Sequence, residues 1–302
     1  MPASFEINET TITQTIDDPW LKSKGIELLV KRDDLLHPLI NGNKWRKLKY
    51  NLIQMQSQNK TELLTFGGAF SNHIHACAAA GKIFGLKTHG IIRGPNLDLS
   101  NPTIQFAQQC GMQLHVVNRI EYKLRNDSQY LAELQEKFPD AYILAEGGTN
   151  TYAVPGCAEL AQSLPEHDYL ICPTGSGGTL AGLIEGSNTA TQIIGIAVLK
   201  QAQYLTEEVR ELSCKAQSQT NWQLLCDFHG GGYGKFTPEL WAFCQHMDIT
   251  HNLPLEPIYS GKMMYAIWNL IEQDYFPSGS KIIAIHTGGL QGLKGLKYRK
   301  LI

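Results

Sequence analysis

The sequence predicts an α/β protein of two domains, with open, twisted, parallel-rich sheets that carry helices on both faces. Short apolar runs that favour strands alternate with helix-like runs along most of the chain, an order typical of parallel sheets. Three of the strand-like runs end in glycine-rich turns, and ligands bind at the carboxyl ends of strands in open α/β sheets. A chain of 302 residues suggests about two domains of roughly 150 residues each.

The expected elements come in strand–helix pairs. The run "ELLTFGG" predicts a strand before the helix-like "SNHIHACAAAGKIFG". The run "KTHGIIRG" predicts another before "NPTIQFAQQCGM", where Pro102 suits a helix start. No fixed-period repeat or low-complexity linker marks the domain boundary. Further strands are expected at 112–118, 141–148, 168–178, 192–199 and 281–289, and further helices at 129–138, 179–187 and 260–273.

The composition points to a small-molecule partner. Apolar residues make up 43% of the chain, and the net charge is -2 without a basic block, so neither nucleic acid nor an anionic membrane surface is expected. The seven cysteines form no C-x-x-C pair and mostly sit in apolar surroundings, which is typical of a reducing compartment. The N-terminus lacks a secretory pattern, and no apolar run approaches the ~20 residues of a membrane span, so we expect a cytoplasmic protein.

The stretch "CPTGSGGTLAG" (172–182) is typical of a phosphate site. A strand runs into Gly175, Gly177 and Gly178, and a helix is expected to begin near Thr179. Without Cβ atoms the backbone can approach an anion closely, and its N–H groups and the helix dipole favour a phosphate. Two alternatives remain: an ordinary strand-to-helix turn, and a dinucleotide site, although the acidic residue expected ~20 residues later is missing.

A second helix start follows the turn "FGGAFSNH". Ser71 and Asn72 are of the residue types that cap helices, and the same N-terminus could receive a substrate carboxylate. No acid and histidine are arranged around Ser71 as in a serine-hydrolase elbow. His73 and His75 are two residues apart, a poor spacing for metal on one helical face, so no metal is expected.

Lys44 follows a Gly/Asn-rich turn in "NGNKW", where a solvated surface lysine is the ordinary interpretation. A partly desolvated lysine amine can instead form a Schiff base with an aldehyde cofactor. Pyridoxal 5'-phosphate needs such an amine together with a phosphate cradle, a partner for its ring nitrogen and a pocket for a substrate carboxylate. The motifs above supply candidates for these parts.

Five motifs resemble, in this order, those of the 1-aminocyclopropane-1-carboxylate deaminase and D-cysteine desulfhydrase family: "NGNKWRKL", "GGAFSNH", "TGSGGTLAG", "IYSGKMM" and "HTGG". Members of that family are pyridoxal-phosphate enzymes with the tryptophan-synthase β fold, also called fold type II. The resemblance covers the chain from about residue 10 to 295. It implies a homodimer with a smaller domain of residues 46–150 and a larger one built from 1–45 and 151–302.

The resemblance also implies a role for each matching residue. Lys44 would carry the Schiff base, Ser71 would bind or act on the substrate, and Asn72 would approach the 3'-hydroxyl of the cofactor. Tyr259 in "IYSGK" and Tyr233 in "GGGYGK" match the family's two active-site tyrosines. The phosphate would lie on Thr174, Gly175, Ser176, Gly177, Gly178 and Thr179, and the substrate on Ser71, Asn72, His73 and Ser260.

Two positions bear on the substrate. Deaminases of the family typically have Glu after the first of these tyrosines and Leu before the late Gly-Gly, whereas this chain has Ser260 and Thr287, a desulfhydrase-like pair. We expect Thr287 to face the pyridine nitrogen with Ser260 close by. A hydroxyl leaves that nitrogen largely neutral, which suits expulsion of a thiolate better than cyclopropane opening. His75 stands where many desulfhydrases are expected to have an arginine.

The sequence therefore predicts a pyridoxal-phosphate enzyme that eliminates sulfide from a small D-amino acid, with D-cysteine as the favoured substrate. Opening of 1-aminocyclopropane-1-carboxylate, or a reaction of another D-amino acid, is the alternative within the same fold. A nucleotide-dependent oxidoreductase and a non-catalytic protein that binds a phosphate ligand are the alternatives from other classes.

Overall fold

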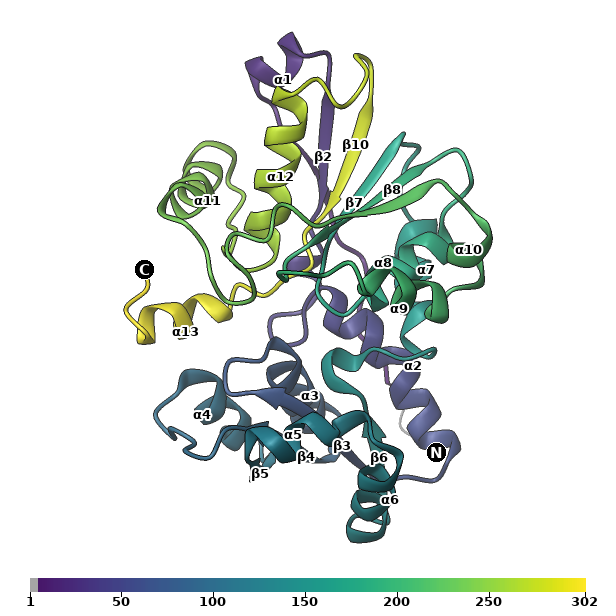
Figure 1. Ribbon diagram of the computed structural model, residues 1–302, viewed down its shortest axis with the longest axis vertical. Coiled ribbons are helices and arrows are strands. Elements are labelled where there is room, and N and C mark those ends of the chain that lie inside the picture. The colour runs from purple at the N-terminus through teal and green to yellow at the C-terminus, as the bar shows by residue number, and fades with distance from the viewer. Residues whose placement is uncertain (1–4) are drawn as a thin grey trace. The chain divides into compact units, whose positions relative to one another are not determined.

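The computed structural model describes residues 5–302, and contacts within the chain divide it into two compact units. Unit 1 contains residues 37–153 and 291–302 together with the stretch that ends at Asn8, and unit 2 contains residues 9–36 and 154–290. Each unit has a sheet of its own (Figure 1). The domain boundaries expected from the family resemblance stay a prediction.

Unit 2 is built on a six-stranded sheet within the described residues, in the order β1-β2-β10-β7-β8-β9. Strand β1 runs antiparallel to β2, and every other neighbouring pair is parallel. Parallel neighbours need crossover connections, and helices supply them here. The strands are β1 (Thr13–Thr15), β2 (Glu27–Lys31), β7 (Tyr169–Thr174), β8 (Gln192–Ala197), β9 (Trp222–Leu225) and β10 (Lys281–Ile285).

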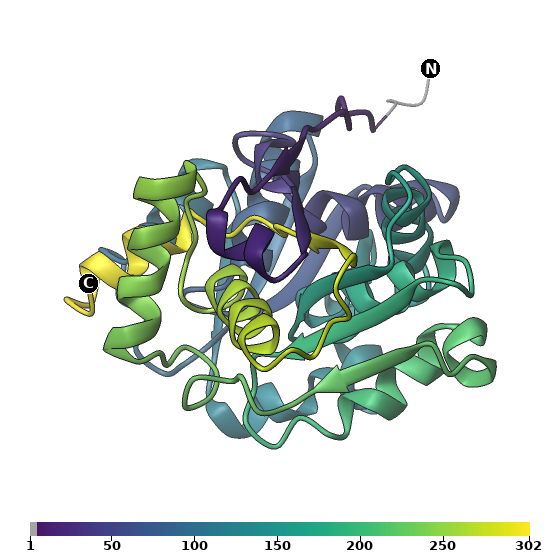
Figure 2. The same ribbon diagram turned by 90° about the horizontal axis from the view of Figure 1, so that it is seen from above.

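Helices cover both faces of this sheet because its strands bury side chains in both directions. Leu28 and Val30 of β2 pack on one face with α11 and α12, which lie side by side in Figures 1 and 2. Leu29, between them in the sequence, packs on the opposite face with α7 and α8. The helices of this unit are α1 (Pro19–Ser23), α7 (Ala153–Gln162, which begins at the unit boundary), α8 (Gly178–Gly186), α9 (Leu205–Leu212), α10 (Cys214–Ser218), α11 (Pro238–His251) and α12 (Ser260–Glu272).

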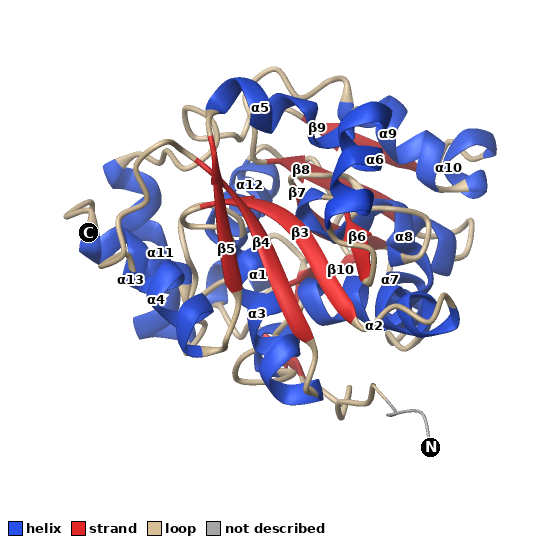
Figure 3. Cartoon of the chain, turned by 90° about the horizontal axis from the view of Figure 1, so that it is seen from below, coloured by secondary structure: helices blue, strands red, loops and turns tan. Residues whose placement is uncertain are grey.

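Unit 1 is built on a four-stranded parallel sheet in the order β5-β4-β3-β6, visible in Figure 3. Its strands are β3 (Glu62–Gly68), β4 (Lys87–Arg93), β5 (Gln113–Val117) and β6 (Ala141–Leu144). Leu64 and Phe66 of β3 pack with Tyr122 and Leu134 on one face. The helices are α2 (Asn43–Ser57), α3 (Asn72–Phe84), α4 (Pro102–Gln109), α5 (Arg119–Lys123), α6 (Ser128–Lys137) and α13 (Gly292–Tyr298).

The predicted fold class is confirmed, and the expected strands and helices match observed elements. The strand expected at 141–148 ends at Leu144, and a 3₁₀ turn takes residues 146–148, where Gly147 has a φ of 71°. The turns after β7 and β10 follow neighbouring strands, but the turn after β3 belongs to the other sheet.

Two structural findings bear on function class. No helix in residues 5–302 is long and apolar enough to cross a membrane. Nor does any group of three or more His, Cys, Asp or Glu side chains in that range gather where it could hold a metal ion.

Candidate active site

The loop between β7 and α8 is shaped to receive an anion. Thr174, at the end of β7, is buried, and Gly177 precedes α8 with a φ of 72° and no side chain that caps the helix. The uncapped N-terminus leaves a positive helix end available to a phosphate. A Cβ on Gly175 would lie 3.1 Å from the Tyr259 ring, so the absence of a side chain there lets this ring pack directly on the loop. The loop therefore fits a phosphate group.

The two predicted active-site tyrosines lie together in unit 2. The rings of Tyr233 and Tyr259 meet edge to face, with centroids 6.1 Å apart, and Tyr233 is 53% exposed. The buried ammonium of Lys262 donates to the carbonyls of Gly232 (2.9 Å) and Val198 (3.2 Å) and so holds the loop that carries Tyr233. Burial lowers the pKa of Lys262 to about 8, and the nearby Glu256 charge opposes the shift.

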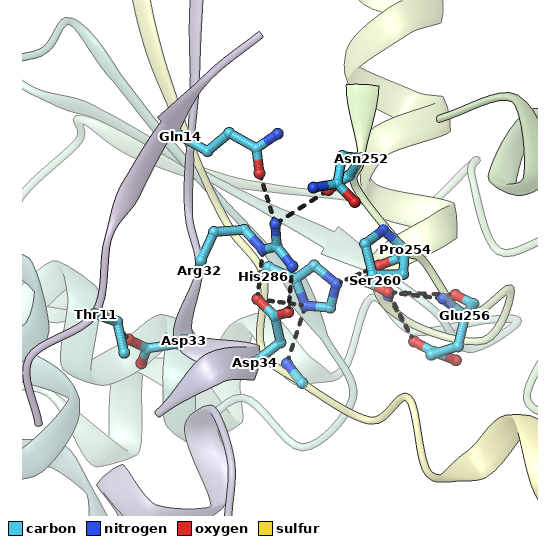
Figure 4. Close-up of polar contacts among 11 residues, drawn as sticks. Thr11, Gln14, Arg32, Asp33, Asp34, Asn252, Pro254, Glu256, Ser260 and His286 are labelled. Carbon is cyan, nitrogen blue, oxygen red and sulfur yellow. Dashed lines mark hydrogen bonds and ion pairs between the residues drawn. The ribbon is translucent and has the colours of Figure 1, made fainter. Parts of the chain in front are cut away.

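Ser260 begins α12, and its hydroxyl is committed to Glu256 (Figure 4). The hydroxyl accepts from the Glu256 N–H at 3.1 Å and donates to Glu256 Oε1 at 3.2 Å. The Glu256 carboxylate also accepts the backbone N–H groups of Ile258, Tyr259 and Ser260 at 2.8 to 2.9 Å. Burial raises the pKa of Glu256 to about 7, against the effect of these donors. This buried carboxylate therefore organises the start of α12.

Thr287 lies two residues beyond β10 and is buried. The preceding residue, His286, is completely buried and hydrogen bonded on both ring nitrogens: to the Pro254 carbonyl at 2.8 Å and to the Gly288 N–H at 3.2 Å. Behind it, Arg32 binds both carboxylate oxygens of Asp34 (Figure 4). The turn that carries Thr287 is therefore fixed by buried hydrogen bonds.

In unit 1, Lys44 is the second residue of α2, and Gly42, which precedes the helix, has a φ of 58°. Lys44 is half-buried beside the fully buried Trp45. Burial lowers the pKa of His73 and raises the pKa of Cys77, and the Lys44 charge adds to the first shift and opposes the second. The ammonium of Lys44 thus acts on groups in the first turns of α3. Unit 1 brings together two motifs that are separated in the sequence.

Ser71 caps α3. Its hydroxyl oxygen accepts the backbone N–H groups of His73 at 3.2 Å and Ile74 at 3.3 Å. Gln291 Nε2 donates to the side-chain oxygen of Asn72 at 3.1 Å, which turns the amide N–H₂ of Asn72 away from Gln291. An amide group held in this way can donate to an oxygen such as a ring hydroxyl.

The histidines of α3 face the interior of unit 1. His73 is bonded to the Thr65 hydroxyl at 2.8 Å, and because that hydroxyl donates to the Leu144 carbonyl, His73 donates through Nε2. His75 stacks on Phe106 with ring centroids 3.8 Å apart. A substrate-binding role for His73 stays a prediction, since its polar contact is to the strand β3 behind it.

The sequence missed four residues that organise these sites: Glu256, Lys262, His286 and Gln291. The signal for Glu256 was present, because an acid between Leu255 and Pro257 in "LPLEPIYSG" is unusual for a solvated face. Lys262 likewise sits among apolar residues in "SGKMMY". The other two carry no local signal, because their partners are distant in the sequence.

Comparison with known proteins gives the family. The family model described as "Pyridoxal-phosphate dependent enzyme" matches residues 9–288. The chain belongs to the pyridoxal-phosphate dependent enzyme family. The predicted cofactor and enzyme class are thereby confirmed, and the phosphate-shaped loop before α8 agrees with them.

Individual relatives show which members of this family the enzyme resembles. It is 29% identical to the bifunctional D-cysteine desulfhydrase/1-aminocyclopropane-1-carboxylate deaminase of Arabidopsis thaliana, over 89% of this chain and 74% of the relative. It is 25% identical to a D-cysteine desulfhydrase of Yersinia enterocolitica, over 89% of this chain and 88% of the relative. A solved ACC deaminase homologue superposes with a TM-score of 0.85 at 27% identity, covering 100% of this chain and 99% of that one. The resemblance seen in the five motifs is confirmed.

Replacing Ser71 with alanine separates capping from chemistry. The variant loses the acceptor for two N–H groups of α3, so we expect its free energy of unfolding to fall by about 1 kcal/mol. If Ser71 also contacts the substrate, kcat should fall on the order of 10²-fold while bound cofactor is retained. Asn118→Ala is the matched control, because Asn118 caps α5 of the same unit. Equal turnover in both variants would leave Ser71 as a cap alone.

Acid should destabilise the enzyme through its buried histidines. Burial lowers the pKa of His75 to about 4, with a contribution from the Lys294 charge, whereas an unfolded histidine titrates near 6.5. Between those values the unfolded state binds more protons, so the contribution of His75 is complete above pH 6.5 and is lost as the pH falls toward 4. Its maximum is about 3 kcal/mol. Across this pH range, the free energy of urea unfolding should fall less steeply with decreasing pH in His75→Gln than in wild type. An equal slope in the two proteins would contradict the lowered pKa of His75.

Proposed function

We propose that the enzyme is a D-cysteine desulfhydrase, which converts D-cysteine and water to pyruvate, sulfide and ammonia. The observation that carries the proposal is that Glu256, the carboxylate beside residue 260, already accepts three backbone N–H groups and the Ser260 hydroxyl. The Glu256 carboxylate is therefore engaged with the start of α12. Thr287 is left as the candidate hydrogen-bond partner of the pyridine nitrogen. A hydroxyl partner supports elimination of a good leaving group.

Bound pyridoxal phosphate draws electrons from the Cα of an attached amino acid, which labilises the Cα proton. Lys44 would anchor the cofactor aldehyde, and its amine, when free, would take up the Cα proton of the substrate. Its position supports this role, because it is half-buried in the first turn of α2, beside the buried Trp45.

The remaining residues bind and orient. The loop of residues 174–179 would hold the phosphate on the uncapped N-terminus of α8. Ser71, through its hydroxyl proton, would hold the substrate carboxylate at the N-terminus of α3, and the Asn72 side-chain amide would donate to the 3'-hydroxyl. Tyr259, packed against Gly175, and Tyr233, whose ring meets it edge to face, would border the substrate thiol. A hydrosulfide ion that leaves beside two phenol groups can take up a proton from either.

Deamination of 1-aminocyclopropane-1-carboxylate is the second candidate. It is supported by the bifunctional relative and by the solved ACC deaminase homologue, which covers the full length of this chain. The two candidates differ in the demand they make on the ring nitrogen, since opening a carbon–carbon bond needs a stronger electron sink than expelling sulfide.

Both substrates should be assayed side by side at equal concentration with the cofactor-saturated enzyme, with L-cysteine as the control for stereochemistry. We expect sulfide and pyruvate in equal amounts from D-cysteine, little from L-cysteine, and little or no 2-oxobutanoate from the cyclopropane acid. Preference for the cyclopropane acid would overturn the proposal in favour of the second candidate. Inactivity toward all three would point to another D-amino acid.

A further inference from the structure

His286 connects two segments of unit 2 that both carry proposed site residues. Its ring is 0% exposed and lies between two backbone groups (Figure 4). Nδ1 lies 3.2 Å from the N–H of Gly288, the residue after Thr287, and Nε2 lies 2.8 Å from the carbonyl oxygen of Pro254. Pro254 heads the segment that runs through Glu256 to Tyr259.

These two contacts define the tautomer of His286. A backbone N–H can only donate, so Nδ1 must accept and carries no proton. A carbonyl oxygen can only accept, so Nε2 must carry the proton and donate. An imidazolium would place a second N–H against the Gly288 N–H and lose one of the two bonds. The neutral Nε2–H form satisfies both partners.

The charged groups that face His286 are compatible with a neutral ring. Asp34 Oδ1 is 3.7 Å from Nδ1, and a lone carboxylate at that distance would favour an imidazolium. Arg32 neutralises it with two hydrogen bonds of 2.9 and 2.8 Å, and is itself held by Gln14 Oε1 and the Asn252 carbonyl. Burial lowers the pKa of His286, which outweighs the opposing effect of Asp34.

We propose that His286, as its neutral Nε2–H tautomer, is a positioning residue that holds the Thr287 turn in register with the segment that ends at Tyr259. The inference rests on the proposed function, in which these two residues contact the cofactor ring and the substrate. Gly288 has a φ of 81° and Gly289 a φ of 97°, and because glycine can adopt many conformations, a contact such as the His286 bond helps to fix the turn in this one.

Three substitutions of His286 distinguish the effects of its two hydrogen bonds. His286→Asn places an amide oxygen near the position of Nδ1 and can still accept from Gly288, whereas His286→Gln places an amide N–H near Nε2 and can still donate to Pro254. His286→Leu keeps apolar volume and removes both bonds. His246→Gln is the control, because His246 is exposed on α11 of the same unit. Each protein is first saturated with pyridoxal phosphate and then dialysed.

We expect His286→Leu to lose pyridoxal phosphate at least about 10-fold faster than wild type, with Asn and Gln intermediate and the control unchanged. Loss of the cofactor at the wild-type rate from the Leu variant would overturn the proposal. So would Asn and Gln variants no better than Leu, because the polar contacts would then be irrelevant. If all three variants are equally destabilised against heat but retain the cofactor as wild type does, His286 only contributes packing. That result would also overturn the proposal.

The tautomer can be measured directly in the holoenzyme. With ¹⁵N-labelled histidine, the ring signals of His286 are those absent from the His286→Asn spectrum. We expect a protonated Nε2 and an unprotonated Nδ1 at neutral pH, and an Nδ1–H tautomer or an imidazolium would refute the assignment. Neither this spectrum nor cofactor retention depends on which amino acid is turned over. An enzyme inactive on D-cysteine would therefore remove the proposed substrate and leave the test of His286 intact.

Discussion

Lys44→Ala is expected to abolish turnover and the visible absorbance of enzyme-bound pyridoxal phosphate. Alanine has no amine to bond the cofactor aldehyde and none to hold the Cα proton, so both proposed functions of the residue disappear together. We expect kcat to fall by about 10³-fold or more. Absorbance of the purified protein and steady-state assay with D-cysteine measure the two losses.

Lys49→Ala is the matched control, because Lys49 lies in the same helix α2 and its ammonium is 5.3 Å from the Tyr50 ring centroid. It should keep the absorbance and the activity of wild type. Stability should be nearly unchanged in Lys44→Ala, since a half-buried lysine in the first turn of a helix adds little to folding. Retention of both absorbance and turnover in Lys44→Ala would mean that another lysine anchors the cofactor.

Glu256→Ala is expected to lower the free energy of unfolding by about 3 to 5 kcal/mol. The substitution leaves the N–H groups of Ile258, Tyr259 and Ser260 without their acceptor in the interior of unit 2. The segment has little room to rearrange around the lost side chain, because α12 approaches it so closely that a Cβ on Gly261 would lie 2.8 Å from the Glu256 carbonyl oxygen. Urea unfolding at constant pH measures the change.

The conservative variant Glu256→Gln gives a pH test. The pKa of Glu256 in the folded protein, about 7, lies above the usual carboxyl value of 4.5, so the folded state binds more protons between them. The contribution of the carboxyl group to stability therefore falls as the pH rises through this window. Glutamine does not titrate, and the cost of Glu256→Gln should shrink between pH 5 and pH 8. Glu239→Ala, at an exposed helix start, should cost less than about 0.5 kcal/mol. A pH-independent cost would show that Glu256 remains ionised throughout.

Local sequence patterns predicted helix caps and turns around the candidate site, because such features depend on a few neighbouring residues. The capping of α3 by Ser71 follows from the preference of serine for that position, and the left-handed Gly177 follows from the glycine-rich turn before α8. The alternation of short apolar runs with helical ones was sufficient for the fold class, because parallel neighbours require crossover helices. The strand expected through residue 148 failed because Gly147 takes a left-handed conformation that no strand accommodates.

Contacts between distant segments were not predictable in this way. The expected position of Ser260 close to the pyridine ring stays a prediction, and the bonds of its hydroxyl to Glu256, four residues earlier, are visible only in the folded chain. His286 depends on Pro254, 32 residues earlier in the chain, and on Asp34, which β2 brings to the same end of the sheet as β10. Nothing in the local run "AIHTGG" distinguishes a buried, fixed imidazole from an exposed one.

The sequence by itself determined the fold class and the cofactor, because the alternation of strands with helices and the spacing of residues around glycines and helix starts are local features of the chain. Only the tertiary structure decided which charged side chains are buried and what neutralises them: Glu256 against helix amides, Lys262 against carbonyls, and Asp34 against Arg32. The physical reason is that burial makes an unpaired charge costly, so each of these groups takes its partner wherever the fold supplies one. That partner is set by strand order and helix packing, which no single stretch of sequence contains.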